Sequence, residues 1–279
     1  MLQLYRDLSY KISKLVTASY STSFLIAVNR LKPALRNAVY SIYGFVRLAD
    51  EIVDTFNCYD KKTLLEKFEN DYYDAMQQGI SLNPVLYSFC ETVRHYKIPD
   101  ELIRAFLKSM KYDLSVINYN SADETNEYIY GSAEVVGLMC LKIFTENDEK
   151  LYSDLLVPAK RLGAALQRVN FLRDLKNDTQ VLKRCYFHDM INQKFDETIK
   201  RKIINDIDDD FNSSYPGIKK LPSDSKLGVI IAYYYFRRLL DKIKRTPAEK
   251  LLEARIRVPD IVKLFLLVKA YLVCKLKLV

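Results

Sequence analysis

The sequence predicts an all-α fold built as one domain over residues 1–279, and three observations favour it. Only 7 Gly and 8 Pro occur, too few for a sheet protein with many tight turns or for a glycine-rich nucleotide loop. Apolar residues recur at helical spacing along most of the chain. Hydrophobic residues make up 49% of the sequence, enough for a large core, and no repeat or flexible linker divides it.

Turn signals divide the chain into ten expected helices. In chain order these cover 3–18, 33–57, 61–78, 84–95, 99–117, 124–145, 148–177, 196–213, 224–245 and 258–277. Proline steps mark several of the boundaries. They are Lys32-Pro33, Asn83-Pro84, Ile98-Pro99, Pro216-Gly217 and Thr246-Pro247.

The charge and the cysteine content indicate which kind of binding partner and which cellular compartment to expect. The formal net charge of +8 favours an anionic partner, but no run of five or more basic residues occurs, so we expect no nucleic-acid binding. Five cysteines without a C-x-x-C pair indicate free thiols in a reducing compartment, and two histidines do not favour a zinc site. We therefore expect a cytoplasmic protein.

The two ends of the chain bear on membrane contact. The first residues carry charges throughout and do not form a secretory signal. The last, IVKLFLLVKAYLVCKLKLV, are very apolar but are interrupted by lysines, whereas a spanning helix needs about 20 mostly apolar residues. We expect a buried terminal helix, with a membrane-touching surface as the alternative.

The stretch VRLADEIVDTF, residues 46–56, places acids in a segment that otherwise has the pattern of a buried helix. Residues four apart share a helix face, so Asp50 and Asp54 project together, with Arg47 and Tyr43 one and two turns earlier. Glu51 lies about 100° round the helix from Asp50. The acids face either water or an internal site.

A second polar stripe lies far downstream in LQRVNFLRDLKNDTQ, residues 166–180. Its members recur at spacings of 3, 4 and 4, and they are Gln167, Asn170, Asp174 and Asp178. Two acidic helices that face each other would suit Mg²⁺, because carboxylates hold this ion while substrate phosphates fill its other positions. Arg47 and Arg173 are candidates for bidentate phosphate contacts.

Acid pairs at this spacing also arise by chance. With 35 acids in 279 residues, about four such pairs are expected, so one pair alone is weak support. Asp206 and Asp210 in NDIDDDF have the same spacing, within a cluster that is charged on every side, as at an exposed helix end. We assign these two residues no role. Spacing alone leaves both a metal site and solvated helix faces open.

Two further segments carry side chains suited to ligand contact. In EYIYGSAEVVGLMCLKIF, residues 127–144, Tyr128, Ser132 and Val136 share a face. Gly131 and Gly137 lie within the expected helix, where glycine costs about 1 kcal/mol relative to alanine. They leave room either for a ligand near the backbone or for tight helix packing. The hydroxyls of SYSTSF, residues 19–24, either cap a helix or touch phosphate, and capping is the favoured interpretation.

Taken together, four motifs resemble the squalene/phytoene synthase family, and most closely its bacterial phytoene synthases. They are YSTSF (20–24), AVYSIYGFVRLADEIVDTF (38–56), YIYGSAEVVGLM (128–139) and LGAALQRVNFLRDLKND (162–178). The resemblance implies an all-α isoprenoid-synthase bundle around a central cavity. It also implies head-to-head joining of two geranylgeranyl diphosphates through a cyclopropyl diphosphate to phytoene, with release of diphosphate.

Roles at matching positions follow from the same resemblance. Metal ligands would be Asp50, Glu51, Asp54, Asn170, Asp174 and Asp178, holding two or three Mg²⁺ ions, with Mn²⁺ as a substitute. Catalytic residues would be Tyr128, Arg47, Asp50, Asp54, Asp174 and Asp178. Substrate contacts would come from Ser21, Ser23, Phe24, Tyr43, Arg47, Ser132, Val136, Gly137, Gln167, Asn170 and Arg173. Arg168 lies inside the second acidic motif, and helix geometry turns it away from the site.

Other functions compete with this interpretation. Squalene or dehydrosqualene synthesis from farnesyl diphosphate would use the same metal site; squalene formation needs nicotinamide, which phytoene formation does not. A non-catalytic assembly or binding factor would be expected to lose its acids. A basic helical nucleic-acid binder would explain the net charge but not the acidic stripes. Release of a hydrocarbon product allows peripheral contact with the inner face of the membrane.

Overall fold

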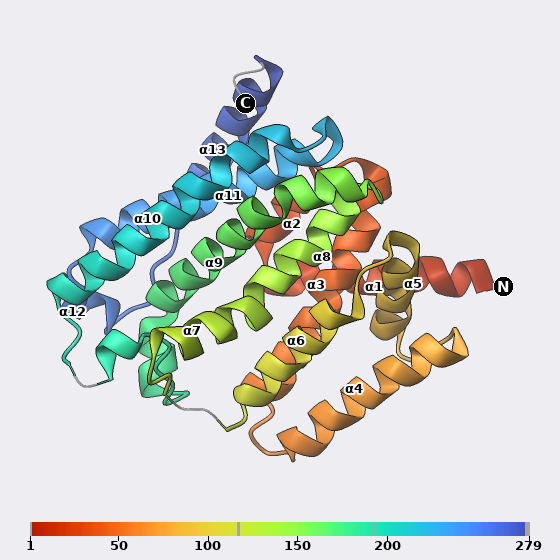
Figure 1. Ribbon diagram of the computed structural model, residues 1–279, viewed down its shortest axis with the longest axis horizontal. Coiled ribbons are helices and arrows are strands. Elements are labelled where there is room, and N and C mark those ends of the chain that lie inside the picture. Colours follow the sequence, from red (N-terminus) through yellow and green to blue (C-terminus); the bar gives the residue numbers. More distant parts are fainter. Residues whose placement is uncertain (1, 116–117, 192, 277–279) are drawn as a thin grey trace.

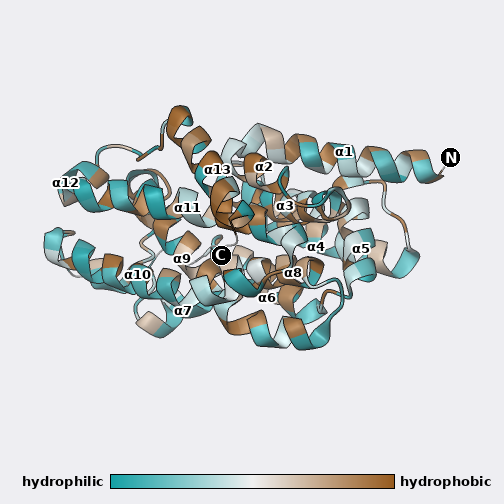
Figure 2. Cartoon of the chain, turned by 90° about the horizontal axis from the view of Figure 1, so that it is seen from above, coloured by the Kyte–Doolittle hydropathy of each residue, from teal (hydrophilic) through white to brown (hydrophobic). Residues whose placement is uncertain are grey.

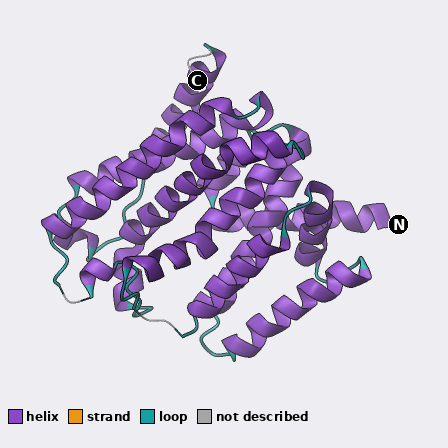
Figure 3. Ribbon diagram, in the orientation of Figure 1, coloured by secondary structure: helices purple, strands orange, loops and turns teal. Residues whose placement is uncertain are grey.

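A computed structural model describes residues 2–115, 118–191 and 193–276. Within this part of the chain the regular structure is helical and no strand forms (Figure 3); Asn118 and Cys185 make a single isolated bridge. The elements are α1 Leu2–Tyr20, α2 Thr22–Val28, α3 Pro33–Asp54, α4 Lys61–Gln78, α5 Pro84–Tyr96, α6 Asp100–Tyr112, α7 Ala122–Ile129, η1 Tyr130–Glu134, α8 Val135–Phe144, α9 Glu149–Gln180, η2 His188–Met190, α10 Glu197–Lys220, α11 Ser223–Arg245, α12 Ala248–Leu251 and α13 Asp260–Lys275. The all-α prediction is confirmed.

The helices form a bundle around the longest of them, α9. Its 32 residues make a rod of about 48 Å. Figure 1 shows α10 and α8 alongside α9, with α3 beyond α8 and α11 behind α10. One buried apolar cluster runs through α3, α5, α6, α8, α9, α10 and α11. The same helices leave a cavity between α2, α3, α8, α9 and α11.

Most expected helices are confirmed to within a few residues, but several segments differ. The short α2 was not predicted; Ser21 caps it by accepting the backbone N–H of Phe24 at 3.3 Å, so the capping interpretation is confirmed. The expected helix 124–145 is interrupted by a π-helical turn, η1. The expected positions 117 and 277 lie outside the described residues.

The Pro216-Gly217 step does not end a helix, contrary to our prediction. α10 continues through it to Lys220. The step instead serves packing, because a Cβ at position 217 would lie 2.2 Å from the Pro158 Cβ of α9. Glycine therefore allows α9 and α10 to approach closely at this point.

The expectation that the C-terminal helix is buried is wrong. Along α13 only Ala270 is buried, and large apolar side chains face outward. Phe265 is 68% exposed and Ile261 is 65% exposed. Figure 1 shows α13 on the outside of α11, with its last turns projecting beyond the bundle. Among the described residues, no helix is both long and apolar enough to span a membrane.

Asp210 also differs from its predicted exposed position. Its side chain is buried and pairs with Arg168 and, at 3.0 Å, with Arg161. Arg168 is turned away from the cavity, as helix geometry predicted, and it joins α9 to α10. Asp206 is exposed, as expected. All five cysteines are free thiols.

Candidate active site

The central cavity has a volume of about 1210 Å³. This exceeds the roughly 300–1,000 Å³ typical of pockets for drug-sized molecules. Along α3 its lining runs from Val39 to Asp54, a distance of about 22 Å at the helical rise. The lining is apolar near Val39 on α3 and Leu155 on α9, and acidic at the carboxyl ends of both helices. The cavity is therefore a long apolar space with one charged end.

Two acidic helices face each other at the charged end. α3 contributes Asp50 and Asp54, and α9 contributes Asp174 and Asp178. Burial, and then the nearby carboxylates of Asp174 and, across the cavity, Asp54, together raise the pKa of Asp178 to about 7. Burial and then Asp54 likewise raise the pKa of Asp50 to about 6, against the opposing effect of Arg47. Negative charge is thus concentrated where little water can screen it.

Arginines from four segments pair with these acids. Arg47 donates to Asp50 at 2.5 Å and also bonds Glu51. Arg184 contacts Asp54 at 2.7 Å. Asp174 accepts a hydrogen bond from its neighbour Arg173 and forms an ion pair at 2.7 Å with Arg255, in the segment before α13. The guanidinium groups lie next to the acids, where they could also bind a phosphate.

Among the described residues that line the cavity, three buried polar side-chain atoms have no hydrogen-bond partner, and one of them, Asp113 Oδ1, lies 3.5 Å from the Arg184 guanidinium in an ion pair. Asn170 Oδ1 is an unpaired acceptor, and Arg47 Nε is an unpaired donor. Buried polar groups are normally satisfied, so an unpaired acceptor points to a cation or its water, and an unpaired donor to an anion. Both atoms belong to residues that line the cavity.

These residues fit a hard divalent cation, provided that the ion pairs between the acids and the arginines break. Within the described ranges, no three acidic, histidine or cysteine side chains converge closely enough to hold an ion as they stand. The carboxylates point instead to guanidinium groups. A cation would compete for the same oxygens and would relieve the crowding of negative charge that, together with the larger effect of burial, raises the pKa of Asp50 and of Asp178.

An aromatic cluster borders the acids. The Tyr128 hydroxyl donates to Asp113 Oδ2 at 2.9 Å. The Tyr128 ring stacks on Tyr186, with centroids 5.1 Å apart, and Tyr186 stacks on Phe171 at 4.2 Å. Arg184 donates to the Asp113 backbone carbonyl at 2.8 Å. Tyr128 is thereby fixed in orientation and linked, through Asp113 and Arg184, to Asp54.

The π-helical turn η1 packs against α9 and forms part of the cavity wall. Gln167 Nε2 of α9 donates to the Ser132 hydroxyl of η1 at 3.4 Å. A Cβ on Gly163 of α9 would lie 3.0 Å from the Ala133 carbonyl oxygen, so the two backbones are nearly in contact. Gly131 packs on α6, where a Cβ would meet the Ala105 carbonyl oxygen at 2.7 Å. At Gly131 tight helix packing is therefore the correct interpretation, whereas Gly137 lines the cavity.

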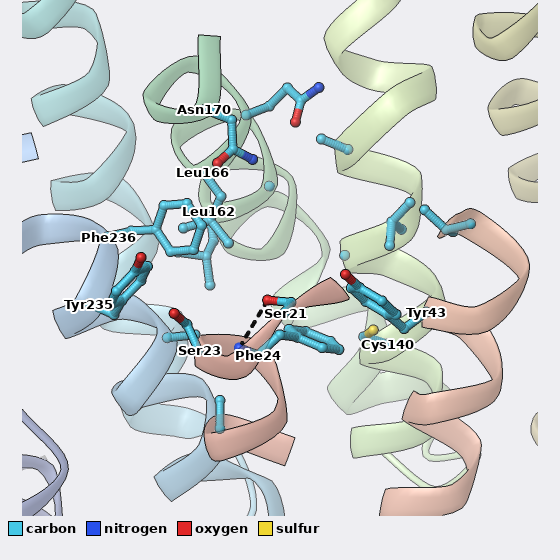
Figure 4. Close-up of a pocket in the computed structure, with 18 of the residues that line it drawn as sticks. Ser21, Ser23, Phe24, Tyr43, Cys140, Leu162, Leu166, Asn170, Tyr235 and Phe236 are labelled. Atoms are coloured by element: carbon cyan, nitrogen blue, oxygen red, sulfur yellow. Dashed lines mark hydrogen bonds between the residues drawn. The ribbon is translucent and has the colours of Figure 1, made fainter. Parts of the chain in front are cut away.

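Residues of α2 and α11 form the side of the cavity shown in Figure 4. Phe24 stacks on Tyr43 with ring centroids 4.9 Å apart. From α11, Phe236 points toward Leu162 and Leu166 of α9. Aromatic faces in an apolar lining can stabilise a passing cation by about 0.5–2 kcal/mol each.

The structure brings all but one of the predicted site residues to the cavity wall. The exception is Glu51, which pairs with Arg47 and Thr55 and is not part of the lining. The sequence reasoning missed four residues of the charged end: Asp113, Arg184, Tyr186 and Arg255. They lie in loops or at a helix end, where no helical periodicity predicts which side chains face the cavity.

An all-α bundle with two acidic helices facing each other across a long apolar cavity has the architecture of an isoprenoid synthase. The solved structures agree: a dehydrosqualene synthase matches with a TM-score of 0.81, 22% identity and 98% coverage of both chains. A squalene synthase from Alicyclobacillus acidocaldarius matches with a TM-score of 0.74 and 18% identity, covering 87% of this chain and 95% of that one. At these identities the likeness concerns the fold.

Sequence comparison gives the family. The model of the squalene/phytoene synthase family matches residues 17–261, so the chain belongs to this family and is a prenyltransferase. Phytoene synthase of Arthrospira platensis is 28% identical over 270 residues, covering 86% of this chain and 85% of that protein. Phytoene synthase 1 of Solanum lycopersicum is 27% identical over 82% of this chain, which spans about 60% of that longer protein. The family resemblance of the four motifs is confirmed.

Proposed function

We propose that this protein is a phytoene synthase that joins two geranylgeranyl diphosphates head to head. The observation that carries the proposal is the cavity, because it combines an acidic, arginine-rich end with a long apolar remainder. Such a space suits a molecule with a diphosphate head and a long hydrocarbon tail. The similarity to phytoene synthases over more than four-fifths of the chain supports the C20 substrate.

The proposed reaction has two stages. One allylic diphosphate leaves its C1, which attacks the double bond of the second substrate; a proton is lost and a cyclopropyl diphosphate forms. The second diphosphate then leaves, the carbon skeleton rearranges, and a second proton is lost to give phytoene. Two substrates thus yield one hydrocarbon, two diphosphates and two protons, and no reductant is consumed.

The chain's own residues would act mainly by binding and shielding. Arg47 and Arg173 would hold diphosphate oxygens through paired N–H donors. Tyr128, Tyr43 and Phe24 would face the cationic carbons, and the apolar lining would keep out water, which would otherwise trap them as alcohols. Asp113 keeps the Tyr128 hydroxyl in place.

Mg²⁺ would be held by Asp50, Asp54, Asp174, Asp178 and the free Asn170 oxygen, while Glu51 stays a predicted ligand that the cavity wall does not include. When bound, such ions neutralise the departing diphosphate as its bond to carbon breaks. Asp54 lies on α3 and Asp178 on α9, so both helices would contribute to holding the ions.

Product analysis tests the proposed function. Purified protein with Mg²⁺ and geranylgeranyl diphosphate, without nicotinamide, should release phytoene, detected by chromatography and mass. A parallel reaction with farnesyl diphosphate tests the alternative activity, synthesis of squalene or dehydrosqualene. A C30 hydrocarbon alone would establish dehydrosqualene synthesis instead, and no hydrocarbon from either substrate would refute prenyl transfer.

Mg²⁺ should stabilise the protein more strongly at pH 8 than at pH 5.5. Burial raises the pKa of Asp50 to about 6 and that of Asp113 and Asp178 to about 7, so the folded chain holds these protons more tightly than the unfolded chain. Their contribution to stability therefore rises as pH falls through 7 and is lost above it. At pH 8 a cation offsets that loss, whereas at pH 5.5 protons compete with it.

Thermal unfolding with EDTA or Mg²⁺ at both pH values measures this effect. At about 100 times the dissociation constant, Mg²⁺ adds about 2.7 kcal/mol, or roughly 5 °C in Tm. Asp178→Asn should reduce the shift. An equal shift at both pH values, or an unchanged shift in Asp178→Asn, would contradict the assignment.

A further inference from the structure

The outer face of α13 is an apolar stripe that no other element of the described residues covers. Its exposed members recur at spacings of three and four residues along the helix, and they are Ile261, Leu264, Phe265, Val268, Tyr271 and Leu272. Ala270 and the partly buried Val262, Leu267 and Cys274 form the opposite face, which packs on the core. Figure 2 shows much of α13 in brown, the colour of hydrophobic residues. Contiguous apolar surface of this kind marks a site of interaction.

The charge of the helix selects an anionic occupant. After Asp260, the described part of α13 carries no acid, and Lys269 and Lys275 are exposed beside the stripe. The whole chain has a formal net charge of +8. A second copy docked on this face would place lysines against lysines, whereas anionic lipid headgroups would pair with them. An apolar stripe flanked by lysines is the pattern of a helix that lies in a membrane interface.

The stripe begins where the cavity reaches the surface. Asp260 and Lys263, in the first turn of α13, both line the cavity, yet the Asp260 side chain is 94% exposed. Lys263 also contacts the Thr22 hydroxyl at the start of α2, another lining segment. The helix therefore joins an opening of the cavity to the exposed apolar face.

We propose that the outer face of α13 docks the protein on an anionic membrane surface, with its apolar side chains in the headgroup region and the cavity opening turned toward the lipid. The docking surface stands on the geometry of α13. Its use, the passage of a prenyl substrate or hydrocarbon product between bilayer and cavity, rests on the proposed function.

Tryptophan emission can report the docking, because the chain contains no Trp. Phe265→Trp places a reporter on the stripe, and Leu82→Trp places one on a residue that is 97% exposed between α4 and α5. Vesicles of equimolar phosphatidylcholine and phosphatidylglycerol should shift the emission of the first variant to shorter wavelength and leave the second unchanged. Phosphatidylcholine vesicles should give a much smaller shift.

Flotation with the same vesicles measures the contribution of the stripe. Phe265→Glu should lower binding at least about tenfold, since it puts a charge in place of a large apolar group. Leu82→Glu, the matched control, should bind like wild type, and activity of both variants in detergent should be unchanged, which shows that they fold. Lys269→Glu with Lys275→Glu should abolish the preference for the anionic vesicles.

Three results would overturn the docking proposal: no binding of wild type to anionic vesicles, equal binding of Phe265→Glu, or a concentration-dependent dimer in light scattering that Phe265→Glu disperses. The last result would assign the face to a second copy. Vesicle binding without any hydrocarbon product would refute the proposed function and leave the docking surface standing.

Discussion

Asp54→Asn and Asp178→Asn should each lower turnover by about 10³-fold or more while the protein stays folded. The two carboxylates come from opposite helices and influence each other across the charged end of the cavity. Each amide keeps the size of the side chain but removes the negative oxygen that would hold a cation. Loss of several kcal/mol of charge stabilisation in the departing diphosphate corresponds to a rate loss of this size.

Steady-state release of hydrocarbon measures the effect, with circular dichroism as the check on folding. Asp206→Asn is the matched control, because Asp206 has the same spacing to Asp210 but is exposed on α10. It should retain full activity. Glu51→Gln should have a smaller effect than either cavity variant, since Glu51 is not part of the lining. Full activity in Asp54→Asn or Asp178→Asn would show that the metal-site assignment is wrong.

Asp210→Ala should destabilise the fold by about 3 kcal/mol, the lower end of the range for breaking a buried ion pair. Asp210 is almost fully buried, and its removal leaves Arg168 without an acid between α9 and α10. Arg161 also loses its ion pair with Asp210, but its side chain is largely exposed, so this loss costs less stability. For a chain of this size the expected fall in Tm is about 6 °C.

Chemical denaturation measures the free energy of unfolding of Asp210→Ala against that of Asp209→Ala. Asp209 is the exposed neighbour, and its substitution should change stability by no more than about 0.5 kcal/mol. A result in which the two variants are equally stable would mean that the buried ion pair contributes nothing to the α9–α10 contact.

The sequence predicted the helices and acid pairs because both depend on spacing within one helix. Asp50 with Asp54, and Asp174 with Asp178, are neighbours at four residues, and the helix alone places them together. Arg184 could not be found in this way, since it reaches Asp54 across 130 residues of chain from a loop. Asp113 lies just past the end of α6, where no repeat pattern marks it.

Two predictions failed for identifiable reasons. Asp210 lies in a run of acids, but helical spacing puts it beside Ile203, Ile207 and Phe211 on the buried face of α10. For α13 the sequence shows an apolar helix and does not say what covers it. Burial depends on how many neighbours the fold supplies, and within the described ranges only one side of α13 is packed against other elements.

The ion pairs at the charged end bear on how a cation and a diphosphate would bind together. On the proposed function, Arg47 and Arg173 would hold phosphate as well as an acid. A cation and a diphosphate would then exchange partners with the existing pairs, the cation taking the carboxylate and the diphosphate taking the arginine. Each ligand would lower the cost of binding the other, a coupling that must be reciprocal. Adding pyrophosphate to the thermal-unfolding series should therefore make the Mg²⁺ shift larger than additive.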